Sequence, residues 1–169
     1  GLFATLIVGT IIEQVGKFIP GSVGETIRTL ALIAKVLTGA GIGCGVAYKF
    51  KESPLVVLSA ATAGMVGAYA SNIIKGTFLV EGAIHVSTPG EPLGAFIAAL
   101  VGIEIGHVVS GKTKLDILVT PVCSIISGSV AGLLVGPGIS KFMTALGDLI
   151  QMGTEQQPFL MGIIVSVLM

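Results

Sequence analysis

Long apolar runs separated by short polar turns are the feature that most limits how this chain can fold. One run, residues 55–74, contains no charged side chain, and about 20 apolar residues in helical form cross the roughly 30 Å of hydrocarbon in a bilayer. Only 11% of the 169 residues are charged and the mean hydropathy is +1.00, whereas soluble domains carry about a quarter charged residues. The sequence therefore predicts an all-α fold, a polytopic transmembrane helical bundle.

The apolar runs predict about six spans, of which the last is truncated. They cover residues 2–19, 29–48, 55–74, 93–109 and 117–135, with a short final run from residue 158. Gly136-Pro137-Gly138 is expected to end the fifth span, and apolar residues at helical spacing over 139–150 predict an amphipathic helix at the membrane interface. Because the chain starts inside an apolar run and its final run is too short to span, we expect residues 1–169 to be a single membrane domain, a fragment of a longer one.

Small residues recur along two of the runs. Gly128, Gly132 and Gly136 are spaced four apart, and residues 39–45 alternate glycine with other small or apolar residues. Such stripes let membrane helices approach closely. A cofactor-binding glycine loop is the alternative for residues 39–45, but no predicted strand precedes them. We expect helix packing and no cofactor.

Charge and cysteine content exclude further classes. The formal net charge is zero, which argues against a nucleic-acid partner. Cys44 and Cys123 lie in apolar runs without CxxC spacing, so they are expected to be small buried residues, with redox or metal roles as the alternative. No set of residues is spaced as metal ligands, and we expect no metal.

A shift of 63 residues aligns residues 30–56 with residues 93–119, so that Gly39 meets Gly102 and Lys49-x-Lys51 meets Lys112-x-Lys114. Either this is chance similarity in a glycine-rich chain or it is a parallel internal repeat of helix, KxK turn and helix. The two KxK turns are short loops on one side of the predicted membrane, which favours the cytoplasmic side.

Charged residues inside the predicted spans are candidates for function, because an ionisable group within a membrane is costly. Glu13 and Lys17 lie four apart and are expected to pair. Glu104 and His107 lie three apart on one face of the fourth span, and we name both as candidate substrate-binding residues. The alternative is that they lie near the interface and pair with each other or with Lys112.

Prolines interrupt the chain just before the fourth span. Pro89 and Pro92 flank Glu91 and prevent a regular helix, so a re-entrant or broken segment is expected near residues 85–94. The Glu91 carboxylate could accept hydrogen bonds from the hydroxyl groups of a polar solute. We name Glu91, Thr88 and Pro92 as candidate substrate-binding residues. The alternative is an exposed turn in which Glu91 favours the start of the following helix.

Three motifs give a resemblance to a known family. They are Thr88-Pro89-Gly90-Glu91-Pro92-Leu93-Gly94-Ala95-Phe96, the Ser110-Gly111-Lys112-Thr113-Lys114 turn with Val119-Thr120-Pro121, and Gln157-Pro158-Phe159-Leu160-Met161-Gly162. Together they resemble the IIC-type membrane proteins of the bacterial phosphotransferase system, in particular the branch that contains the perfringolysin regulator-like proteins. The resemblance implies a multi-pass permease of the bacterial inner membrane, in which Glu91-Pro92 matches a sugar-contacting Glu-Pro on a re-entrant hairpin.

The resemblance favours a permease subunit that binds and translocates a sugar or small polar solute, while phosphorylation is performed by IIA and IIB partner proteins. Neither cysteine lies in a IIB-like setting and neither histidine in a IIA-like one. The alternatives are a membrane-embedded sensor or regulator that binds a ligand without transport, and a structural membrane protein with no solute site. We also expect contact with the lipid bilayer and a homo-oligomer.

Overall fold

The computed structural model describes residues 2–80, 82–84, 90–156 and 166. In chain order, its elements are α1 (Leu2–Phe18), α2 (Ser22–Val36), α3 (Thr38–Lys49), α4 (Pro54–Ala68), α5 (Ala70–Ile74), β1 (Leu79–Val80), β2 (Ala83–Ile84), α6 (Pro92–Val109) and α7 (Asp116–Gln156). The two strands pair antiparallel, with Leu79 opposite Ile84. Apart from this small hairpin and the turns, the described residues are helical, as the all-α prediction requires.

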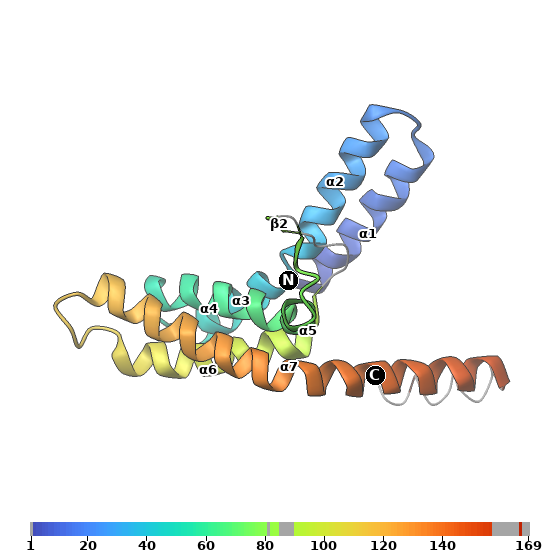
Figure 1. The fold of residues 1–169 in the computed structure, drawn as a ribbon. Coiled ribbons are helices and arrows are strands. Elements are labelled where there is room, and N and C mark those ends of the chain that lie inside the picture. Colours follow the sequence, from blue (N-terminus) through green and yellow to red (C-terminus); the bar gives the residue numbers. More distant parts are fainter. Residues whose placement is uncertain (1, 81, 85–89, 157–165, 167–169) are drawn as a thin grey trace.

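Helices α3, α4 and α6 and the first half of α7 lie side by side as one bundle (Figure 1). Helix α6 packs against both α4 and α7, and α4 also packs against α3. Helices α1 and α2 pack against each other as a separate hairpin that leaves the bundle at a steep angle, and the second half of α7 runs on beyond the bundle. The bundle core is therefore made by α3, α4, α6 and the first half of α7.

Small side chains bring the backbones of the bundle into direct contact. A Cβ atom on Gly43 would lie 2.0 Å from the carbonyl oxygen of Ala60, and one on Gly67 would lie 2.4 Å from that of Gly94. Real Cβ atoms do not approach so closely, so only glycine fits at these positions. Ser124 adds an interhelical hydrogen bond, because its Oγ donates to the carbonyl oxygen of Gly102 at 2.7 Å.

The predicted glycine stripe of the fifth span is confirmed. Cβ atoms on Gly128 and Gly132 would meet Ala98 at 2.6 and 2.9 Å, and one on Gly136 would lie 2.5 Å from the Cβ of Ala70. In α3, fewer of the glycines at 39–45 contact another helix than the sequence suggests. Gly39 and Gly43 contact α4, whereas the position of a Cβ on Gly45 is open.

The prediction that Gly136-Pro137-Gly138 ends the fifth span is wrong, because α7 continues through Pro137 to Gln156. Proline at position 137 removes one backbone donor, but its fixed φ is compatible with a helix, and α7 is continuous on both sides of it. The amphipathic stretch at 139–150 is accordingly the second half of α7. The fourth predicted span agrees closely with α6.

Two other predicted spans are interrupted. The second bends by 41° where α2 meets α3, and the third breaks at Tyr69, between α4 and α5. By length and composition, two helices of the described chain could cross a membrane, α6 and α7, and the bent pair α2 and α3 would make a third. Six spans and an internal repeat stay predictions. The final apolar run lies almost entirely outside the described residues.

Gly128 gives a direct test of the close packing. We expect Gly128→Ala to lower the free energy of unfolding by about 1–3 kcal/mol, because the new methyl group overpacks the contact between α7 and α6. The matched control is Gly138→Ala in the same helix, where a Cβ would have open space and alanine gains up to about 1 kcal/mol of helix propensity. Thermal unfolding in detergent checks both variants. Equal melting temperatures would contradict the packing described here.

Candidate functional site

The segment that carries Glu91 is fixed to the end of α4. The backbone N–H of Glu91 donates to the carbonyl oxygen of Ala68 at 2.8 Å. Gly90 is buried, and a Cβ there would lie 2.5 Å from the Cβ of Ala68 and 3.1 Å from the ring of Tyr69. Glu91 itself is half-buried and extended, with φ −76° and ψ 113°, and Pro92 opens α6.

A second interruption of the backbone lies at the same place. Helix α4 ends at Ala68 and α5 begins at Ala70, while Tyr69 between them has φ −110° and ψ 16°. The Tyr69 side chain is almost fully buried and its ring centroid lies 5.6 Å from that of Phe78. We call residues 68–70 and 90–92 together the broken-helix site. Interrupted helices free backbone groups that polar ligands bind in many membrane transporters.

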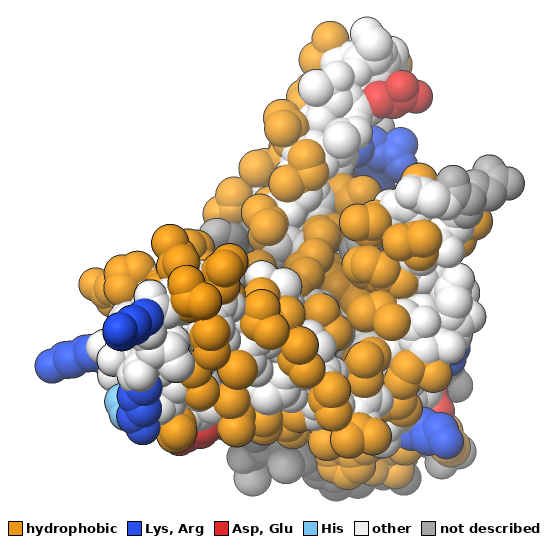
Figure 2. All heavy atoms as spheres, turned by 60° about the vertical axis from the view of Figure 1, so that its left-hand side comes forward, with side chains coloured by type: hydrophobic (Ala, Val, Ile, Leu, Met, Phe, Trp, Pro, Cys, Tyr) orange, Lys and Arg blue, Asp and Glu red, His pale blue; other side chains and the backbone are white. Residues whose placement is uncertain are grey.

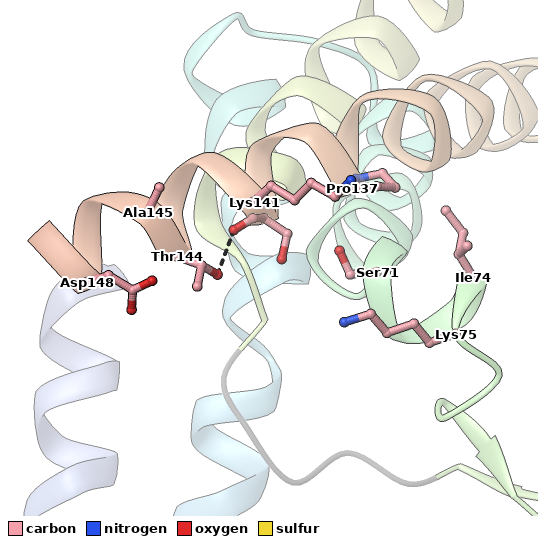
Figure 3. A pocket seen from close by; sticks show the side chains of 9 residues that line it. Ser71, Ile74, Lys75, Pro137, Lys141, Thr144, Ala145 and Asp148 are labelled. Atoms are coloured by element: carbon pink, nitrogen blue, oxygen red, sulfur yellow. Dashed lines mark hydrogen bonds between the residues drawn. The ribbon is translucent and has the colours of Figure 1, made fainter.

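A cavity of about 330 Å³ lies next to the broken-helix site, between α5 and the second half of α7. The contact of Gly136 with Ala70 places it there, because α5 starts directly after Tyr69. Figure 3 shows side chains from both helices around it. It is lined by Ser71, Ile74, Lys75, Pro137, Ser140, Lys141, Thr144, Ala145 and Asp148. No motif in the sequence predicts this cavity, although the polar face of residues 139–150 is a signal for it.

A second cavity, of about 490 Å³, lies within the α1 and α2 hairpin and is lined by Glu13, Glu25, Arg28, Thr29, Leu32 and Lys35. The predicted pair of Glu13 and Lys17 is confirmed, with Nζ 3.7 Å from the carboxylate. Glu13 also pairs with Lys35 of α2. Lys35 lies 22 residues away in the sequence, so spacing along one helix could not reveal this second partner.

Glu104 and His107 both lie on the exposed face of α6. His107 is paired with Glu52 in the turn before α4, with its Nδ1 3.0 Å from the carboxylate. The alternatives in which His107 pairs with Glu104 or with Lys112 are therefore wrong. The Glu52 side chain is only 11% exposed. The pair therefore joins the α3–α4 turn to the end of α6.

The candidate residues named from the sequence do not form one cluster. Glu91 and Pro92 lie at the start of α6, and His107 lies near its end. The helix has 18 residues and is roughly 27 Å long at 1.5 Å per residue. Thr88 lies outside the described residues. Within the described part of the chain, no group of three His, Cys, Asp or Glu side chains lies close enough to hold a metal ion.

The two KxK turns lie together at the end of the bundle opposite the broken-helix site. Ser53 and Ser110, one from each turn, have their hydroxyl oxygens 3.1 Å apart. Lys49, Lys51, Lys112 and Lys114 are all exposed there. Figure 2 shows Lys or Arg side chains gathered with a histidine at one end of a mostly apolar surface. This end is cationic, and we refer to it as the cationic end.

Comparison with known proteins gave one finding. A family model described as "Phosphotransferase system, EIIC" matches residues 1–169. Searches of curated proteins and of solved structures returned no match.

The position of the two turns leads to a test of topology. We expect the cationic end to face the cytoplasm, because short loops rich in lysine stay on that side. In a background without Cys44 and Cys123, a single cysteine at position 113 should resist an impermeant thiol reagent added to intact cells. A single cysteine at position 77, which follows α5 at the opposite end, should react. Labelling at position 113 from outside would reverse the assignment.

Proposed function

We propose a function from one premise: this chain belongs to the phosphotransferase system EIIC family, whose model matches all of residues 1–169. Membership makes it a membrane subunit of the permease type. The proposal is that it binds a sugar or another small polar solute and moves it across the bacterial inner membrane. Phosphorylation of the solute would then be performed by IIA and IIB partner proteins.

The observation that carries this proposal is the broken-helix site. The hydrogen bond between the N–H of Glu91 and the carbonyl oxygen of Ala68 joins two interruptions of the backbone, and non-helical backbone at membrane depth survives where it is buried in protein or lines a water-filled cavity. A half-buried carboxylate at such a place is suited to accept hydrogen bonds from sugar hydroxyls. We therefore assign Glu91 as the solute contact, and Thr88 and Pro92 stay candidate substrate-binding residues from the sequence.

Several finer features belong to the same proposal. The α3–α4 and α6–α7 hairpins carry their KxK turns at the same end, which supports a parallel repeat related by an axis along the membrane normal. The bent and broken helices would then make up about six spans in a multi-pass protein. Glu104 supports a homo-oligomer, because a carboxylate on the outer face of an apolar helix is costly toward lipid and is better covered by a second copy.

Glu91→Gln tests the solute contact. The change keeps the shape of the side chain and removes its charge, so loss of a charge-assisted hydrogen bond should weaken solute affinity by about 1.5–3 kcal/mol, roughly ten- to a hundredfold. The measurement is binding of a panel of labelled sugars to the purified full-length protein. Glu25→Gln is the matched control, because Glu25 lines the separate cavity of the α1 and α2 hairpin.

Glu104→Gln is the third variant in this experiment, and we expect it to lower both the stability of the fold and the affinity for the solute. Unchanged sugar affinity in a well-folded Glu91→Gln protein would remove Glu91 from the solute site, and a loss confined to Glu25→Gln would move the site to the other cavity. Uptake by the same proteins in vesicles, with and without phosphotransferase partners, separates transport from sensing. Binding without uptake in the complete system would favour the sensor.

A further inference from the structure

The cavity between α5 and α7 combines cations, hydroxyl groups and apolar side chains in one wall. Lys75 comes from the end of α5 and Lys141 from α7, and Asp148 supplies the one acidic side chain among the lining residues. Ser71, Ser140 and Thr144 provide hydroxyl groups, and Ile74, Pro137 and Ala145 provide apolar surface. Two lysines against one aspartate leave this lining with a net charge of +1 near neutral pH.

The arrangement in Figure 3 separates the charges within the cavity. Lys75 points into the space between the two helices, whereas Asp148 lies toward the far end of α7, away from Pro137. The Thr144 hydroxyl donates to the backbone oxygen of Ser140 at 2.9 Å, which leaves its lone pairs available to a ligand. The cavity thus presents cations at one part and an acceptor at another.

Exposed apolar side chains surround the polar lining of the cavity. It lies at the end of the bundle opposite the KxK turns, where α4 gives way to α5. The other face of the same stretch of α7 is apolar and exposed, with Phe142 at 59% and Leu149 at 60% exposure. Ile74, which lines the cavity, is itself 56% exposed. A ligand in this position meets polar groups on one side and apolar surface on the other.

We propose that this cavity binds the headgroup of an anionic phospholipid. The lysines bind the phosphate, and Asp148 accepts hydrogen bonds from headgroup hydroxyls, which favours phosphatidylglycerol. Its single negative charge matches the net charge of the lining. The acyl chains extend over Ile74 and the neighbouring apolar surface, because a volume of about 330 Å³ holds a headgroup and not the chains. Basic pockets between membrane helices bind phospholipid headgroups by this chemistry.

The same phosphate chemistry could come from a soluble ester, but the exposed apolar wall favours the lipid. A soluble phosphate ester gains nothing from Ile74, Pro137 and Ala145, whereas burial of acyl chain against them is favourable. The proposal goes beyond solute transport and does not depend on it, since it concerns a different part of the protein and a different ligand.

The test compares two double variants that remove equal charge. Lys75→Gln with Lys141→Gln removes the cations of the cavity, and Lys112→Gln with Lys114→Gln removes two cations from the cationic end. Native mass spectrometry of the purified full-length protein measures bound phosphatidylglycerol, with phosphatidylcholine as the zwitterionic comparison. We expect the cavity variant to bind phosphatidylglycerol roughly ten- to thirtyfold more weakly, since each lysine near an anionic surface contributes about fivefold.

Melting temperatures in detergent supply the second measurement. Phosphatidylglycerol should raise the melting temperature more than phosphatidylcholine does in the wild type and in the Lys112→Gln, Lys114→Gln variant. In the Lys75→Gln, Lys141→Gln variant the two lipids should have the same effect. Equal losses in both double variants, or equal effects of the two lipids on the wild type, would overturn the proposal. Stabilisation by sn-glycerol 1-phosphate equal to that by the lipid would also overturn it, in favour of a soluble phosphate ester.

Discussion

Direct contact between the backbones of α4, α6 and α7 is the interaction on which the rest of this structure depends. Lipid is as apolar as leucine, so burial from water does not hold membrane helices together, and close van der Waals packing takes its place. Positions such as Gly67 and Gly128, where a Cβ would lie 2.4 and 2.6 Å from neighbouring atoms, make that packing available. The Ser124 hydrogen bond to Gly102 then fixes the relative position of α6 and α7.

Such close packing displaces polar chemistry to the two ends of the bundle. Apolar side chains and short hydroxyl side chains such as Ser124 fill the space between the helices, so the middle of the bundle contains few groups that could bind a polar ligand. At one end, Tyr69 and Gly90 interrupt the backbone, and the cavity with Lys75 lies beside them. At the other end, Glu52 and His107 join the two hairpins. The functions proposed above follow this division, with ligands at the broken end and the cytoplasm at the cationic end.

Features that depend on local composition could be predicted from the sequence, and features that depend on tertiary contact could not. Helix α6 and the contacts of Gly128 and Gly132 follow from hydropathy and spacing. The continuation of α7 through Pro137 could not be predicted, because a proline between two glycines is typical of the end of a helix. The pair of Glu52 and His107 joins residues 55 apart in the sequence, and the cavity needs α5 and α7 to meet. The roles of Glu91 and Glu104 rest on the sequence and stay proposals.

The packing also limits where a solute could pass. A solute path between α4, α6 and α7 would require these helices to separate along their whole length. Their separation would break the close contacts that the glycines make. The outer face of α6 carries no such obstacle, and it presents Leu93, Glu104 and His107 on one side. Glu104 is costly there if lipid covers it, whereas a second copy, or further chain, facing it would enclose a polar path beside α6. An interface on the outer face of α6 therefore suits the proposed transport better than a pore through the bundle.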